Sequence, residues 1–209
     1  MKRAVLPLLL AVALPTAPAL AAPPSAFKAE GTAVAFAGGN APEQRTPVKL
    51  YYQDGKMRLE LVQPSMGESI LLAKRGSSQI TLLDPTQKMA FVMAADAIGG
   101  QAGVPSVEQF LDMAAWKAQL KGAKRLPGTE VKGNERCTRY QKTISGTDYT
   151  VWLSDALELP MQIEGAVDGK PRFRIAISSV SKGQQPATLF GVPAGYQKAE
   201  LDANTLIQK

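Results

Sequence analysis

Apolar and polar residues alternate from Val48 to Met93, with interruptions only at short turns. Apolar positions such as Leu50 lead into the dipeptide Asp54-Gly55, and the alternation resumes on its other side. A period of two residues predicts β-strands with one apolar face, and Asp-Gly between two such runs predicts a tight hairpin. We therefore expect much of this chain to form one antiparallel sheet.

The same pattern continues along the chain and predicts a mainly β (α+β) fold. A first strand is predicted at residues 29–36, and turn formers at Gly76, Pro85 and Gly169 separate further alternating runs. The apolar positions after residue 127 are Tyr149, Val151, Leu153, Met161, Ile163, Phe173, Ile175 and Ile177. Together these runs predict a single curved antiparallel sheet that forms an incomplete β-barrel.

One helix is expected between residues 106 and 122, as a lid or plug over the sheet. Ser106 can cap the free amides and Gln109 can reach back, which is typical of a capping box, and Gly122 is placed to end the helix. One apolar stripe contains Val107, Phe110, Leu111, Ala114 and Ala118, and a second contains Met113, Trp116 and Leu120. Either both stripes belong to the core, or one contacts something besides the sheet.

The first residues are typical of an export signal. Lys2 and Arg3 precede an apolar run from Ala4 to Leu14, and small residues end at Ala21. This run is shorter than the roughly 20 residues that span a bilayer, so we expect an exported protein without a stable membrane anchor. The predicted organisation is a signal peptide at residues 1–21, a tether at 22–28 and a single domain at 29–209.

One helix is too small to cover the apolar face of such a sheet. About ten strands, ~4.8 Å apart and ~20 Å long, present roughly 950 Å², whereas a helix of about 15 residues covers roughly 220 Å². Curling of the sheet hides part of the apolar area that the helix leaves uncovered. The area that is still uncovered predicts room for an apolar ligand. Methionines on this face are typical both of adaptable binding surfaces and of ordinary cores. The predicted ligand-binding residues are Leu59, Leu61, Leu72, Met89, Phe91, Met93, Met113, Trp116, Val151, Met161, Phe173 and Ile175.

The residue types in the chain exclude several kinds of site. The sequence has no histidine and one cysteine, which removes Ser-His and Cys-His nucleophiles, histidine metal sites and thiolate clusters. No spacing selects a catalytic pair of carboxylates, and no phosphate-binding glycine motif occurs. We therefore predict a protein that is not an enzyme, with no catalytic residue, cofactor or metal.

Two further features each allow two interpretations. Cys137 lies in a strand-like run, either as a half-buried structural residue or as a reactive thiol. Lys121, Lys124 and Arg125 form a local basic cluster, either as a solvated helix end or as an anion site. The net charge of +6 is otherwise spread along the chain, so nucleic acid is not an expected partner.

Short motifs of the chain resemble the periplasmic carriers that sort lipoproteins to the outer membrane. The segments similar to the carriers are residues 68–72, 80–85, 89–91 and 190–195. The whole order, with residues 159–161 before the last hairpin and 195–197 at the end, resembles more closely small exported bacterial proteins of unassigned function placed beside those carriers. The resemblance implies a half-barrel with helical lid elements, an apolar cavity for acyl chains and a location in the periplasm. It also implies an arginine that latches the lid, for which Arg58 is the nearest match.

These observations lead to two functional hypotheses. The first is a periplasmic binding or carrier protein that shelters an acyl chain or another apolar ligand in a half-barrel cavity, with a lipid or a lipid-modified protein as partner. The alternative is an envelope interaction or sensor module that binds another protein on its concave face or sheet edge. The sequence leaves the ligand and the oligomeric state open.

Overall fold

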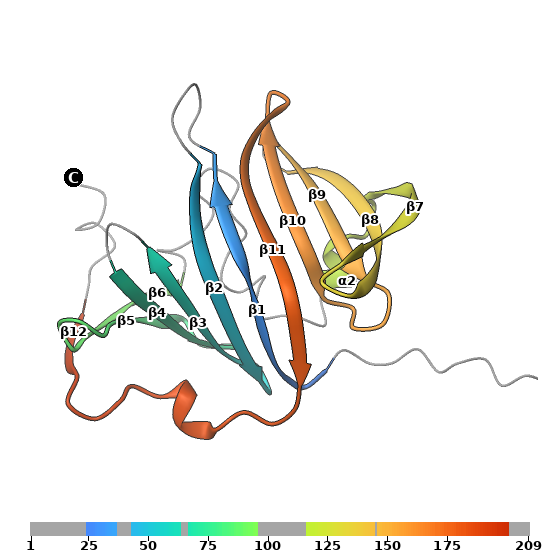
Figure 1. The fold of residues 1–209 in the computed structure, drawn as a ribbon. Coiled ribbons are helices and arrows are strands. Elements are labelled where there is room, and N and C mark those ends of the chain that lie inside the picture. Colours follow the sequence, from blue (N-terminus) through green and yellow to red (C-terminus); the bar gives the residue numbers. More distant parts are fainter. Residues whose placement is uncertain (1–23, 37–42, 64–66, 96–115, 145, 201–209) are drawn as a thin grey trace, which may run out of the picture.

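The computed structural model describes residues 24–36, 43–63, 67–95, 116–144 and 146–200, which form one curved sheet (Figure 1). The first six strands are β1 (Ala26–Ala35), β2 (Gln44–Gln53), β3 (Lys56–Gln63), β4 (Gly67–Lys74), β5 (Gln79–Asp84) and β6 (Met89–Ala94). The others are β7 (Lys124–Lys132), β8 (Glu135–Ile144), β9 (Thr147–Ser154), β10 (Pro160–Val167), β11 (Lys170–Lys182) and β12 (Gln197–Glu200). Two short helices, α2 (Trp116–Gln119) and the 3-10 helix η3 (Ala187–Phe190), complete the described elements.

β1 and β11 join two groups of hairpins into this sheet. The strand order is β12-β6-β5-β4-β3-β2-β1-β11-β10-β9-β8-β7, and the pairing is antiparallel except between β12 and β6. The strands β12 and β7 lie at opposite ends of this order, so the sheet is not closed into a barrel. This arrangement confirms the predicted mainly β fold and the incomplete barrel. The parallel pairing of β12 is an addition that the alternation did not predict.

Local sequence explains the turns at which the strands reverse. Asp54 and Gly55 both have positive φ angles, 49° and 78°, as a two-residue turn between twisted strands requires. β2 and β3 pair across this turn, with Gln53 opposite Lys56. β1 begins at Ala26, earlier than the predicted start at residue 29, so part of the predicted tether belongs to the sheet.

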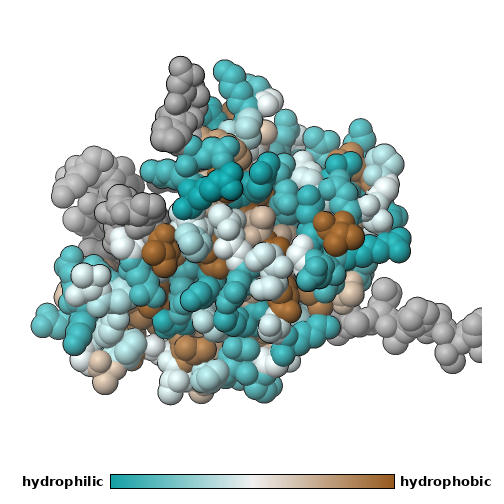
Figure 2. Space-filling model, viewed as in Figure 1, coloured by the Kyte–Doolittle hydropathy of each residue, from teal (hydrophilic) through white to brown (hydrophobic). Residues whose placement is uncertain are grey.

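The two faces of the sheet carry cores of unequal size. We call the inner face the one that carries the larger core. Its buried members from β1 to β6 are Phe27, Ala29, Leu50, Tyr52, Met57, Leu71, Ala73, Ile80 and Met93, and those from β8 to β10 include Cys137, Tyr149, Val151, Leu153, Met161 and Ile163. The outer face carries a small core of Ile70, Leu72, Leu83 and Ala90 under the C-terminal segment. In the view of Figure 2, hydrophilic residues cover most of the visible surface and hydrophobic residues form separate small patches.

A close approach of two strands requires glycine at position 31. β1 shifts register between Glu30 and Gly31, where it passes β11. A Cβ atom on Gly31 would lie 2.2 Å from the carbonyl oxygen of Ala176, well inside contact distance. The lack of a side chain therefore allows the central pair of strands to join the two groups of hairpins.

The helix predicted at residues 106–122 is described only from residue 116 onward. There α2 spans Trp116–Gln119, and the amide of Leu120 donates to the carbonyl of Trp116 at 3.0 Å. Gly122 follows with a φ of 79°, in agreement with its predicted role at the helix end. The predicted cap at Ser106, the rest of the first stripe before residue 116, and Met113 lie outside the described residues.

Candidate functional site: the inner apolar face

A row of apolar side chains crosses β2 to β6 on the inner face. Strand register pairs Leu50 with Leu59, Leu59 with Leu71, Leu71 with Leu82, and Leu82 with Phe91. We call these five residues, Leu50, Leu59, Leu71, Leu82 and Phe91, the inner row. Directly opposite side chains on neighbouring strands lie in contact distance, so the inner row is a continuous apolar band.

Three members of the inner row are less completely buried than the neighbouring side chains on one side of it. Leu59, Leu82 and Phe91 are partly buried and pack against the larger core. Met57 and Met93, which face the same way at neighbouring positions, are only 2% and 3% exposed. The inner row is therefore the part of this wall where apolar side chains of β3, β5 and β6 keep access to water.

The other half of the inner face combines fully buried and partly buried side chains. Ile163 lies opposite both Val151 and Ile175, and Tyr149 makes an edge contact with Phe173 at 6.1 Å between ring centroids. Trp116 of α2 belongs to the same core and is 4% exposed. This half thus contributes a packed wall.

The structure brings most of the predicted ligand-binding residues to the inner face. Leu59, Phe91, Met93, Trp116, Val151, Met161 and Phe173 belong to the larger core or pack against it. Leu61, Met89 and Ile175 are partly buried at positions that alternate in phase with inner-face residues of their strands. Whether these residues bind a ligand remains a prediction, because their placement alone does not test it.

The placement of Leu72 on the ligand wall is wrong. Leu72 lies opposite Thr81 and belongs to the small outer core with Ile70 and Leu83. Its neighbour Leu71 faces the inner side instead. Four apolar residues in a row, Ile70 to Ala73, leave the phase of β4 open in the sequence, and the pairing with β3 and β5 decides it.

Sequence reasoning also omitted Leu82, which the structure places at the centre of the inner row. Leu82 and Leu83 are adjacent and both apolar, so the local pattern does not say which of them faces inward. The alternation from Ile80 to Leu82 was the available indication, because Ile80 is a buried inner-face residue. The pairing of Leu82 with Leu71 and Phe91 resolves it.

Arg58 lies on the outer face, away from the inner wall. It forms an ion pair with Glu60 at 2.7 Å, and its Nη1 donates to the carbonyl of Leu189 at 3.3 Å. Leu189 belongs to η3 of the C-terminal segment. In the described part of the chain, Arg58 therefore holds the C-terminal segment rather than α2.

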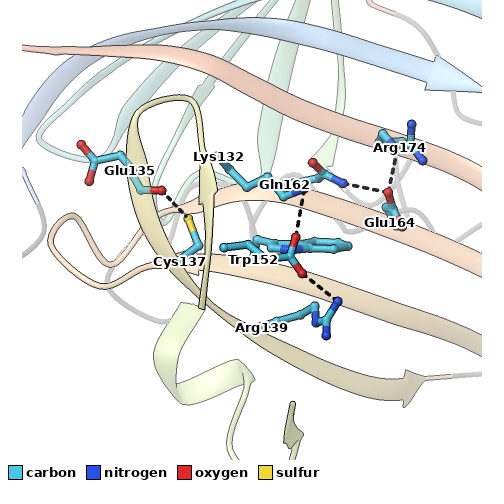
Figure 3. Close-up of polar contacts among 9 residues, drawn as sticks. Lys132, Glu135, Cys137, Arg139, Trp152, Gln162, Glu164 and Arg174 are labelled. Carbon is cyan, nitrogen blue, oxygen red and sulfur yellow. Dashed lines mark hydrogen bonds and ion pairs between the residues drawn. The ribbon is translucent and has the colours of Figure 1, made fainter. Parts of the chain in front are cut away.

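A polar cluster around Trp152 supports the β7–β9 end of the sheet (Figure 3). The indole N–H of Trp152 donates to Glu130 at 3.0 Å, and Lys132 lies 4.8 Å from the centre of the indole ring. Arg139 pairs with the same carboxylate at 2.8 Å. The hydrogen bond from Trp152 is the largest of the contacts that lower the pKa of the Glu130 carboxyl. Because the carboxylate of Glu130 is held by Trp152, Lys132 and Arg139 together, we interpret this cluster as structural.

Cys137 is fully buried in the larger core, and its thiol donates to the carbonyl of Glu135 at 3.4 Å. Burial raises the pKa of this thiol to about 11. A thiol is reactive as the thiolate, so both observations favour the structural interpretation over the reactive one.

The described residues contain neither a metal-binding cluster nor a membrane-spanning helix. No group of three or more His, Cys, Asp or Glu side chains there is placed to hold a metal ion. Nor does that part of the chain contain a helix long and apolar enough to cross a membrane.

Comparison with solved structures finds proteins of similar fold at low sequence identity. The crystal structure of MucB shares 15% identity, with 84% of this chain and 60% of that chain covered and a TM-score of 0.48. The LolA superfamily protein NE2245 from Nitrosomonas europaea shares 11% identity, with 82% and 92% covered and a TM-score of 0.43. In the MucA/MucB complex of Pseudomonas aeruginosa the TM-score is 0.45 at 15% identity, with 78% of this chain and 54% of that chain covered.

These neighbours include a member of the carrier superfamily that the sequence resembles. The chain spans only 60% and 54% of the two MucB chains that it matches. No protein-family model matches the sequence, and no curated protein matches it either.

Proposed function

We propose that this protein is an exported, periplasmic binding protein that shelters an acyl chain or another apolar ligand on the inner face of its open sheet. The observation that carries the proposal is the inner row, in which Leu59, Leu82 and Phe91 stay partly exposed beside a buried core. Covering apolar area stabilises a complex by about 25 cal/mol per Å² before the costs of association. An apolar ligand is therefore the occupant that this wall favours.

Three further observations support the proposal. The N-terminal sequence is typical of an export signal, and short motifs resemble lipoprotein-sorting carriers of the periplasm. The core behind the inner wall also includes the unbranched side chains of Met57, Met93 and Met161, which let a core adapt its shape. The proposed partner is a lipid or a lipid-modified protein, and the proposed role is carriage rather than catalysis.

Uptake of a fluorescent fatty acid by the delipidated protein tests the proposal. We expect saturable binding by the native chain and at least a tenfold loss of affinity in Leu59→Glu, because a carboxylate in an apolar wall is costly to desolvate. Val62→Glu is the matched control, since Val62 lies on the same strand and is 50% exposed. Its affinity should stay within about twofold of the native value, because the side chain remains in water.

Two additional measurements separate loss of binding from loss of folding. The thermal midpoint of each variant shows whether Leu59→Glu still folds. Leu82→Ala removes apolar wall area without adding charge and should weaken binding about three- to tenfold, in proportion to the lost area. A native chain that takes up no fatty acid, or equal losses in Leu59→Glu and Val62→Glu, would contradict the proposal. Copurification of a protein partner without lipid would favour the interaction module instead.

A further inference from the structure

One corner of the sheet holds two lysines directly opposite each other. Lys56 begins β3 and Lys74 ends β4, and strand register pairs these two residues. Both are exposed, and neither forms an ion pair with a described residue. Like charges directly opposite on neighbouring strands are destabilising. The pair therefore opposes folding slightly, so fold stability does not explain why two lysines stand opposite each other.

Two other basic side chains, on β1 and β3, are neutralised by carboxylates. Lys28 pairs with Glu30 at 2.6 Å on β1, and Arg58 pairs with Glu60 at 2.7 Å on β3. The carboxylate that β3 supplies is thus taken by Arg58. The excess positive charge is specific to the end of the strands, where Lys56 and Lys74 lie.

The fold adds two more cations to this corner. The turn after β4 brings Arg75 against the β2–β3 turn, where its amide donates to the carbonyl of Gly55 at 2.7 Å. Lys182 ends β11 at the same edge, since it lies opposite Phe27, which in turn lies opposite Tyr52. We call Lys56, Lys74, Arg75 and Lys182 the basic corner. It lies at the ends of β2 and β11 that are at the bottom of Figure 1.

The composition of the basic corner favours an anionic lipid surface over a protein. Specific protein interfaces centre on buried aromatic or aliphatic anchors. The large hydrophobic residues that stand exposed in the described chain are Val62, Val131 and Ile144, and none of them lies at this corner. The cations are instead exposed and surround small turn residues such as Gly76. A bilayer of anionic lipids presents a diffuse negative charge that attracts such cations.

The basic corner also adjoins the inner wall. Met57 follows Lys56 and Ala73 precedes Lys74, and both belong to the larger core. Arg75 donates to the hydroxyl of Tyr52 at 2.9 Å, and Tyr52 belongs to that core too. Contact of this corner with a bilayer would bring the end of the apolar wall to the lipid surface.

We propose that the basic corner docks this protein on membranes of anionic lipid, so that an apolar ligand passes between the bilayer and the inner row. The ligand-transfer part rests on the proposed function, whereas docking does not. Each basic residue near such a surface contributes about 1 kcal/mol, or about fivefold in binding. The cations of the basic corner, offset in part by the exposed carboxylate of Asp54 in the β2–β3 turn, thus support a weak, reversible contact that salt reverses.

Flotation of the native chain with vesicles tests docking without any apolar ligand. At low salt we expect binding to phosphatidylglycerol vesicles and little binding to phosphatidylcholine vesicles. Binding should vanish at about 1 M salt, where the screening length is about 3 Å. Lys56→Gln with Lys74→Gln should weaken binding about 25-fold, because two charges are lost from the contact.

The matched control is Lys124→Gln with Lys170→Gln, which removes the same net charge. Both residues are exposed and lie at the beginnings of β7 and β11, at the other end of the sheet. This variant should lose less than about threefold, because its charges lie beyond the screening length from the surface. Equal losses in the two double variants would overturn the proposal, since net charge would then suffice. Equal binding to both kinds of vesicle, or retention by an immobilised acidic protein but not by vesicles, would also overturn it.

A transfer assay separates this proposal from the proposed function. The Lys56→Gln, Lys74→Gln variant should take up fluorescent fatty acid in solution with native affinity, because neither residue belongs to the wall. It should deliver that fatty acid to phosphatidylglycerol vesicles at least tenfold more slowly than the native chain. A native chain that takes up no fatty acid would contradict both the binding function and the transfer step. A native chain that takes up fatty acid but does not bind phosphatidylglycerol vesicles would contradict docking alone.

Discussion

At the scale of single residues, Cys137 illustrates how burial decides chemistry. The residue types of β8 leave its thiol open to either a structural or a reactive role. The structure buries it completely in the larger core, and this burial raises its pKa to about 11. The unfolded chain loses the thiol proton near pH 9, whereas the folded chain retains it to about pH 11. Since the unfolded state then binds fewer protons, stability falls as the pH rises through this window.

We predict that Cys137→Ser removes part of the alkaline loss of stability. Between pH 9 and 11 the native chain should lose up to about 3 kcal/mol through this thiol, as a shift of one pKa unit corresponds to about 1.4 kcal/mol. Urea unfolding across this pH range measures the slope in both chains. Burial also raises the pKa of Tyr149. This effect is present in both chains, so it cancels when their slopes are compared. Identical slopes, or fast reaction of the native thiol with a disulfide reagent at pH 8, would contradict the assignment.

At the scale of elements, the C-terminal segment forms a second layer on the outer face. Val192 and Tyr196 pack against the small outer core, and β12 then pairs with β6. The amide of Gln185 donates to the side chain of Gln53 at 2.7 Å, and Arg58 donates to Leu189. These contacts explain why β4 can be apolar on both faces.

Loss of the Tyr196 side chain should loosen this layer. We predict that Tyr196→Ala lowers the free energy of unfolding by about 1–2 kcal/mol, because a partly buried aromatic ring leaves the outer core. Lys198→Ala is the control, since Lys198 is exposed on β12 and should change stability by less than about 0.5 kcal/mol. Urea denaturation gives both values. Equal stability of the two variants would show that the segment adds little to the fold.

At the scale of the whole molecule, an open sheet leaves two edges that could pair with other chains. β12 is only 4 residues long. β7 carries Lys124 and Arg125, and Pro127 lies where its register with β8 shifts. Charges, proline and irregular register on an edge strand oppose pairing with further strands. The edges are thus protected, although the sheet is not closed.

Removal of this protection should promote self-association. We predict that Arg125→Val with Pro127→Val increases light scattering of concentrated protein at least several-fold, because β7 then presents a regular apolar edge. Lys170→Val with Pro171→Val places the same residues at the start of β11, an interior strand of the sheet, where they lie opposite Val167 and Ala166 of β10. That control should scatter as the native chain does. Equal scattering by both double variants would attribute the effect to hydrophobicity alone.

The sequence by itself determined the β class, the hairpin turns and most of the inner wall. An alternation such as Met89, Phe91, Met93 fixes which side chains share a face, because successive side chains of a strand point to opposite sides. Asp54-Gly55 fixes a turn for an equally local reason, since both residues tolerate a positive φ. Local geometry was sufficient for these features.

Only the tertiary structure decided the phase of β4, the position of Arg58, the parallel pairing of β12 and the basic corner. Continuous apolar runs such as Leu71-Leu72 have no preferred face until neighbouring strands fix the register. Lys56 and Lys74 meet for the same reason, although 18 positions separate them in the sequence. Strand pairing between distant segments sets these contacts, and no local period of the chain encodes it.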